Sequence, residues 1–157
     1  MSIAPLKAGT DLLSGGPDRL IVCAGEAVDA AERVLGHAKA GVRIKIQELG
    51  GVDQAQHAAH GLAWLATAVE GLRQMHHWAK ELKGEGKFGE FEQLILIAAF
   101  AEYSAQIAGG IPMNQGEIIR AEAMGVARAD IRKYEDAVAD LVEAGSAQSV
   151  KSRLAQL

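Results

Sequence analysis

The stretch from Asp53 to Lys83 constrains the fold of this 157-residue chain more than any other part of the sequence. It contains no proline, and apolar or small residues recur in it at alternating spacings of four and three, which places them on one side of a helix. Two such stripes are present, each with a histidine. The first stripe is Ala58, Leu62, Leu65, Val69, Leu72, His76 and Ala79, and the second stripe is His57, Gly61, Trp64, Ala68, Gly71, Met75, Trp78 and Leu82. Because a surface helix normally carries one apolar stripe, two stripes predict a central helix with packed neighbours on two sides.

Two further long helices are predicted beside this segment. The first spans residues 17–49, where apolar residues recur at i, i+3 and i+4. Its end at Val42–Ile46 alternates apolar and basic residues, so a short strand is the alternative there. The second spans residues 88–108, and its middle is apolar all round, which predicts the most buried part of the fold. A buried strand over Leu94–Phe100 is the alternative, but the length of the segment and its alanines favour a helix.

The remaining parts of the chain are predicted to be looser or shorter. Residues 1–16 contain proline and glycines that oppose regular structure. Asp53 follows a Gly-Gly break and is the expected N-cap of the central helix. Asn114 and Glu117 form the sequence pattern of a capping box and predict a short helix over residues 115–124. Two more helices are expected before Leu157. The sequence therefore predicts one all-α domain, 1–157, an antiparallel helical bundle of three long helices plus two or three short C-terminal helices over 112–157.

Composition and charge exclude several classes of function. A formal net charge of -4 argues against a nucleic-acid partner, which would need a basic surface. The longest uninterrupted apolar run, Leu94–Ala101, is eight residues, whereas about 20 are needed to cross a bilayer. The single cysteine, Cys23, excludes an intrachain disulfide, and the N-terminus lacks the pattern of a signal peptide. We therefore expect a cytoplasmic protein without a membrane partner.

A few polar side chains are candidates for chemistry. Asp53, His57 and His60 lie at i, i+4 and i+7, and they could hold a metal if a fourth ligand came from a neighbouring helix. The alternative is an N-cap aspartate with two polar histidines near a helix end. No glutamate is followed by a histidine three residues later, so the pattern of di-iron carboxylate proteins is absent. His76 lies in an apolar stripe and is expected to be structural, and Cys23 has no accompanying histidine motif and is expected to be inert.

Three segments, 57–76, 86–96 and 102–120, carry a resemblance to a known family, and the string GGIPMNQGEIIR at residues 109–120 is its most specific part. They resemble the helical N-terminal extension that precedes the catalytic part of certain bacterial acyl-CoA dehydrogenases. The resemblance is strongest from about Gln54 to Gly125. In that family FAD, the acyl-CoA and the catalytic glutamate belong to the dehydrogenase part, downstream of the extension. The resemblance therefore implies no catalytic residue and no cofactor-binding residue in this chain.

The resemblance also implies a partner. It would be the catalytic domain of an acyl-CoA dehydrogenase or a second copy of this chain, and apolar surface would be exposed where that partner belongs. The expected partner contacts lie in the most specific string and are Gly109, Gly110, Pro112, Met113 and Gln115.

Two functions of different classes follow. The first is a non-catalytic helical interaction or assembly module, related to the extension of an FAD-dependent oxidoreductase. The second is a stand-alone helical binding protein or metal-dependent enzyme that uses His57 and His60. Bound metal would favour the second, whereas an oligomer without flavin colour would favour the first.

Overall fold

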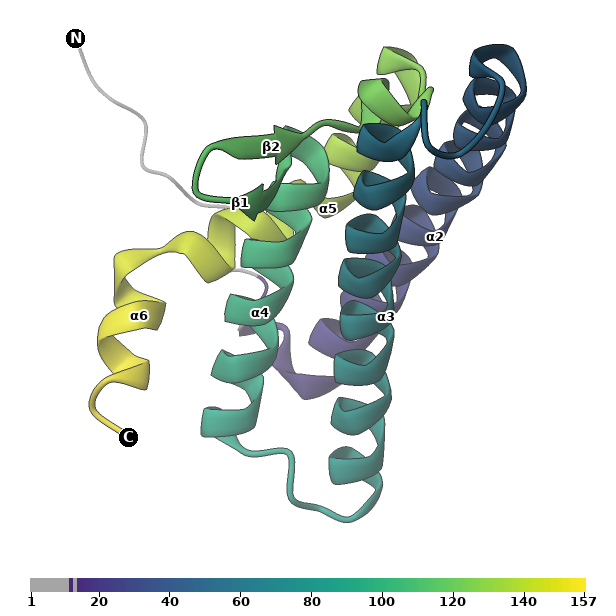
Figure 1. Ribbon diagram of the computed structural model, residues 1–157. Helices are drawn as coiled ribbons and strands as arrows, with labels where there is room; N and C mark the ends of the chain where they lie inside the picture. The colour runs from purple at the N-terminus through teal and green to yellow at the C-terminus, as the bar shows by residue number, and fades with distance from the viewer. Residues whose placement is uncertain (1–11, 13) are drawn as a thin grey trace, which may run out of the picture.

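The computed structural model describes residues 12 and 14–157, and this part of the chain is almost entirely helical (Figure 1). The prediction of an all-α fold is confirmed, with one small hairpin as the exception. The predicted loose segment 1–16 falls mostly on residues 1–11 and 13, which lie outside the described residues. In chain order the elements are α2 (Gly16–Leu49), α3 (Gln56–Gly84), α4 (Glu90–Gly109), β1 (Ile111–Asn114), β2 (Glu117–Ile119), the 3-10 helix η1 (Ala121–Met124), α5 (Arg128–Ser146) and α6 (Gln148–Leu154).

Helices α2, α3 and α4 follow one another in an antiparallel arrangement, joined by short connections (Figure 1). Helix α3 packs against α2 on one side and against α4 on another, as its two stripes predict. The apolar set of α2 is buried along the helix, and Val42 extends it into the segment where a strand was the alternative. That segment is therefore helical. Leu94–Phe100 is helical as well, because it forms the middle of α4.

The two stripes of α3 differ in how well this chain covers them. In the first stripe, Leu65, Val69, Leu72 and Ala79 are at most 1% exposed. In the second, Gly61 and Ala68 are buried, but Trp64 is 40% exposed and Gly71 and Trp78 are only half-buried. The described part of the chain therefore covers the second stripe only in part.

Helix α5 is a fourth member of the bundle. It has 19 residues, nearly as many as the 20 of α4, and it is one of the C-terminal helices that the sequence predicts. It contacts α4 extensively and also reaches α2. The two helices approach closely at Gly145, where an added Cβ would lie 2.3 Å from the backbone oxygen of Ile97. Only α6, with seven residues, is short, and it packs on α4 and α5.

The predicted helix over residues 115–124 is wrong. The chain forms a two-stranded antiparallel hairpin there, with Ile111 opposite Ile119 and Pro112 opposite Ile118, and only Ala121–Met124 makes a helical turn. Burial explains the difference, since Ile111, Met113 and Ile119 alternate with exposed residues and all enter the core. The local capping pattern competes with this period of two and is overridden by it.

The start of the central helix also differs from the prediction. Asp53 lies in a turn before the helix, and the N-cap of α3 is Ala55, without a side-chain hydrogen bond. Ala55 is buried, so packing rather than capping fixes this end. Among the described residues, no helix is both long enough and apolar enough to span a membrane.

Candidate functional site

The hairpin lies beside the C-terminal end of α4 (Figure 1) and contacts the N-terminal half of α3, so it joins the segment around His57 to the segment around Glu117. Ile119 of β2 sits over Gly61 of α3, where an added Cβ would lie 2.5 Å from the Ile119 Cγ1 atom. One turn earlier on α3, His57 Nδ1 lies 2.9 Å from Glu117 Oε1. Glycine at position 61 thus lets β2 approach the helix closely, and the His57–Glu117 pair fastens the hairpin at its tip.

The tip of the hairpin is held by the two residues of the predicted capping box. The Asn114 side-chain amide donates to Glu117 Oε2 at 2.9 Å, and Asn114 Oδ1 accepts from the backbone N–H of Gly116 at 2.9 Å. An asparagine that bonds the backbone two residues on is typical of a tight turn. Glu117 therefore uses one carboxylate oxygen for Asn114 and the other for His57, so it links the turn to the helix.

The predicted partner contacts differ from one another in exposure and in their position on the hairpin. Pro112 and Gln115 are exposed, and Pro112 pairs across the hairpin with Ile118, which is 52% exposed. Met113 is 8% exposed and belongs to the core. Gly109 ends α4, and Gly110, at φ +134°, starts the hairpin in a backbone conformation that favours glycine. We call Pro112, Gln115 and Ile118 the outer hairpin face.

The structure does not bring the three metal candidates together. His57 is paired with Glu117, and His60 Nε2 accepts a hydrogen bond from the Trp64 indole N–H at 3.0 Å. Within the described residues, no group of three or more His, Cys, Asp or Glu side chains is arranged to hold a metal ion. Asp53 lies in the turn before α3, outside the open depression that both histidines line. That depression is lined by Val52, Gln56, His57, Ala59, His60 and Glu117.

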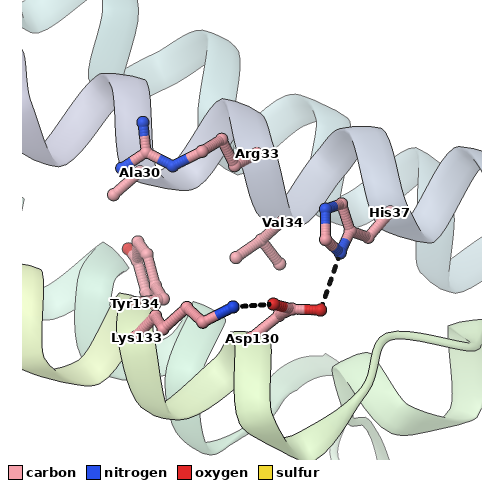
Figure 2. A pocket seen from close by; sticks show the side chains of 7 residues that line it. All are labelled: Ala30, Arg33, Val34, His37, Asp130, Lys133 and Tyr134. Carbon is pink, nitrogen blue, oxygen red and sulfur yellow. Dashed lines mark hydrogen bonds and ion pairs between the residues drawn. The ribbon is translucent and has the colours of Figure 1, made fainter.

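A separate pocket of about 190 Å³ lies between α2 and α5 (Figure 2). Its carboxylate, Asp130, lies 3.0 Å from His37 Nδ1 and 2.8 Å from Lys133 Nζ. Lys133 and, more weakly, His37 hold the pKa of Asp130 below its usual range. Asp130 therefore stays ionised and already neutralised, in the first turn of α5 where a negative charge is favourable. This cluster fastens α5 to α2.

Two further titratable groups have structural surroundings. His76 in the first stripe is half-buried against α2, and its ring bonds the backbone of Ile21. Burial lowers its pKa, followed by the nearby charge of Lys80. Cys23 is half-buried too, and burial raises the pKa of its thiol, which keeps the reactive thiolate scarce.

The comparison with known proteins points to one enzyme. No protein-family model matches the sequence. The chain is similar to (2S)-methylsuccinyl-CoA dehydrogenase of Cereibacter sphaeroides. The two are 41% identical over 143 residues, which cover 88% of this chain but only 26% of the dehydrogenase. The chain thus spans about a quarter of the length of this curated relative, and the predicted resemblance to acyl-CoA dehydrogenases is confirmed.

The contacts that the sequence analysis missed join residues far apart in the chain. No local pattern connects His37 with Asp130, because the pair exists only once α5 has packed on α2. The exposed position of Ile118 could have been found. The alternation of buried and exposed residues at 111–114 and 117–119 has the period of a strand.

Proposed function

We propose that this chain is a non-catalytic assembly module of an acyl-CoA dehydrogenase of the methylsuccinyl-CoA type. In this proposal it packs against the catalytic part of that enzyme and stabilises the assembly. The observation that carries the proposal is the 41% identity along 88% of the chain to one quarter of a dehydrogenase. Identity along most of the helical domain is expected if the enzyme uses the whole domain and not one short segment of it.

The geometry of the described residues supports a packing role. The core is filled by apolar side chains from α2 through α6, and the polar clusters at Glu117 and Asp130 are engaged in fastening elements to one another. The outer hairpin face, in contrast, presents Ile118 to solvent. An exposed isoleucine beside proline and glutamine on a rigid hairpin suits a protein contact with an apolar centre and a polar rim.

The proposal assigns the chemistry to the rest of the enzyme. The parent reaction would be FAD-dependent α,β-dehydrogenation of a branched acyl-CoA in the ethylmalonyl-CoA pathway, in the cytoplasm. FAD and the catalytic glutamate would belong to the catalytic part, as the family resemblance implies. This chain would contribute burial of apolar surface alone. The metal-dependent alternative has no comparable support, since His57 and His60 are engaged with Glu117 and Trp64.

A chimera tests the proposal. The matched quarter of the Cereibacter enzyme is replaced by this chain, and amide hydrogen exchange is compared between the chimera and the isolated chain. We expect slower exchange over residues 111–119 in the chimera, because the outer hairpin face is then covered. Ile118→Asp should remove this extra protection and lower the melting temperature of the chimera, but not that of the isolated chain.

Val22→Asp is the matched control, because Val22 is 59% exposed on α2, away from the hairpin. It should leave the protection of residues 111–119 unchanged. A chimera that fails to fold, or one whose module exchanges everywhere as fast as the isolated chain, would contradict the proposed function.

A further inference from the structure

The partly covered second stripe of α3 has a symmetric pattern. Gly71 lies at its centre, with Trp64 seven residues before it and Trp78 seven residues after it. Seven residues are two helical turns, so each tryptophan lies about 10 Å along the axis from the glycine. We propose that a second copy of this chain docks on this stripe, with the two α3 helices antiparallel and the two-fold axis passing at Gly71.

The centre of the stripe has open space. A Cβ added to Gly71 would meet no neighbouring atom within 4 Å, although Gly71 lies in the middle of a long helix. Gly61 in the same stripe is covered by Ile119 instead. The surface at Gly71 is therefore a shallow open position between two large aromatic side chains, and a glycine there permits a close approach of a second helix.

Side-chain size increases from the centre of the stripe toward both ends. Two crossed helices are closest at the crossing point and diverge away from it. Glycine at the crossing and tryptophan two turns away on each side fit this geometry. In an isologous pair, a residue that contacts another is contacted by it in return. Antiparallel pairing about Gly71 therefore brings Trp64 of one copy to the level of Trp78 of the other, twice.

The charges beside Gly71 are already paired within one copy. The outer flank of the stripe carries Thr67 and Gln74, which are exposed and uncharged, and the Gln74 amide donates to Glu70 Oε1 at 2.7 Å. Glu70 also pairs with Arg73, which lies 2.7 Å from Glu32 of α2. Neither Glu70 nor Arg73 therefore presents an unpaired charge beside the axis.

Polar side chains flank the ends of the stripe. Glu81 is ten residues after Gly71 and His60 is eleven residues before it, so antiparallel pairing sets the Glu81 carboxylate, which lies 3.5 Å from His77 Nδ1 of its own helix, at the level of the His60 imidazole of the other copy. His60 also holds the indole of Trp64 through its 3.0 Å hydrogen bond, which keeps the aromatic side chain in a defined orientation. An ordered tryptophan loses less entropy on association than a mobile one.

The test uses the isolated chain in sedimentation velocity over a wide concentration range. We expect a monomer–dimer equilibrium with a dissociation constant between about 1 µM and 1 mM. Gly71→Arg should abolish the dimer without loss of thermal stability, because its site is open and arginine is a better helix former than glycine. Gly36→Arg is the matched control. Gly36 lies mid-helix in α2, is exposed and also has open space at its Cβ, so this variant should dimerise like the parent.

Two more readouts fix the surface and the register. The chain contains only two tryptophans, and both belong to the stripe, so tryptophan emission should shift to longer wavelength on dilution in the parent but not in Gly71→Arg. In a Cys23→Ser background, Gly71→Cys should form a disulfide-linked dimer on oxidation, and Gly36→Cys should not.

A chain that stays monomeric throughout this range would overturn the proposal, and so would a dimer that survives Gly71→Arg. Protection of Trp64 and Trp78 from hydroxyl-radical oxidation only in the dehydrogenase chimera would also overturn it, since the catalytic part would then occupy the stripe. The proposed assembly function would survive each of these results, because it is tested separately at the hairpin.

Discussion

Ile119 and Gly61 are in direct contact across the junction of the hairpin and α3. A Cβ at position 61 would lie 2.5 Å from Ile119 Cγ1, 2.8 Å from its Cδ1 and 3.2 Å from its Cβ. Ile119 is 1% exposed, so its side chain has little free space into which it could move. The position of the hairpin therefore depends on the absence of a side chain at one position of the central helix.

Gly61→Ala is expected to destabilise the fold. Alanine favours the helix by about 1 kcal/mol over glycine, but forcing an extra methyl group into a packed site costs about 1–3 kcal/mol. We expect a net loss of about 1 kcal/mol in the free energy of unfolding, measured by urea denaturation. Gly36→Ala should give the helix-propensity gain alone, since its added Cβ meets nothing.

A double-mutant cycle separates the clash from other effects of the substitution. Ile119→Ala removes the two atoms nearest to the new methyl group. Gly61→Ala should therefore be better tolerated in the Ile119→Ala background than in the parent, with a coupling of at least about 0.5 kcal/mol. Additive effects of the two substitutions would contradict the close contact.

The helices could be predicted because each is encoded by a periodic pattern many turns long. The apolar residues of α2 and the first stripe of α3 are buried where their spacing predicts. Helix ends are less well encoded. Asp53 has the residue type of an N-cap, yet the N-cap of α3 is Ala55, because the burial of Ala55 fixes where the helix begins. Long patterns sum over many residues, whereas a cap is a single interaction of about 1 kcal/mol.

The hairpin could not be predicted from its local capping pattern. Asn114 and Glu117 do interact, but across a turn between two strands instead of at the start of a helix. The docking of Ile119 on Gly61 joins residues far apart in the chain, and no single-sequence pattern contains it. The same holds for His57 and Glu117, whose pairing follows only from that docking.

Gly41→Ala is expected to destabilise the fold more than Gly61→Ala does. A Cβ there would lie 2.2 Å from the Met124 backbone oxygen and 2.8 Å from the Gly125 Cα. Backbone atoms cannot move by changing a rotamer, and Gly125 at φ +87° is itself held in a conformation that favours glycine. We expect a loss of about 3 kcal/mol in unfolding free energy, with α2 and the η1 turn separating first in hydrogen exchange. A variant as stable as the parent would show that the two backbones are not in contact.

The lowered pKa of His76 predicts a loss of stability in mild acid. Burial comes first among the causes, then Lys80, and the Ile21 hydrogen bond and Asp29 oppose them, while His77 adds to the lowering. Because the folded chain binds the proton less tightly than the unfolded chain, this contribution is fully present above the ordinary value of 6.5. This contribution to stability decreases as the pH falls below that value. Once the pH is below the pKa of His76 in the folded chain, the contribution decreases no further.

The measurement is the melting temperature of the parent and of His76→Gln from pH 8 downward. Below about pH 6.5 the melting temperature of the parent should fall more than that of His76→Gln. His77→Gln should keep most of the pH response of the parent, because it removes only the smallest of the causes that lower the pKa of His76. An equal pH response of the parent and His76→Gln would contradict a buried neutral imidazole.

The attachment of α6 depends on one ion pair and on apolar packing. Arg153 Nε and Nη2 each lie 2.7 Å from an oxygen of Glu90, at the start of α4, and this pair lowers the pKa of Glu90. Val150 is buried in the core, and Leu154 packs half-buried against it. Arg153→Ala should therefore speed amide exchange across Gln148–Leu154 while the melting temperature of the bundle stays nearly unchanged, because both partners of the pair are exposed. Arg153→Lys should recover only part of the protection, since lysine cannot form the two parallel hydrogen bonds. If Val150→Ala speeds exchange in α6 and Arg153→Ala does not, the apolar contact alone holds this helix.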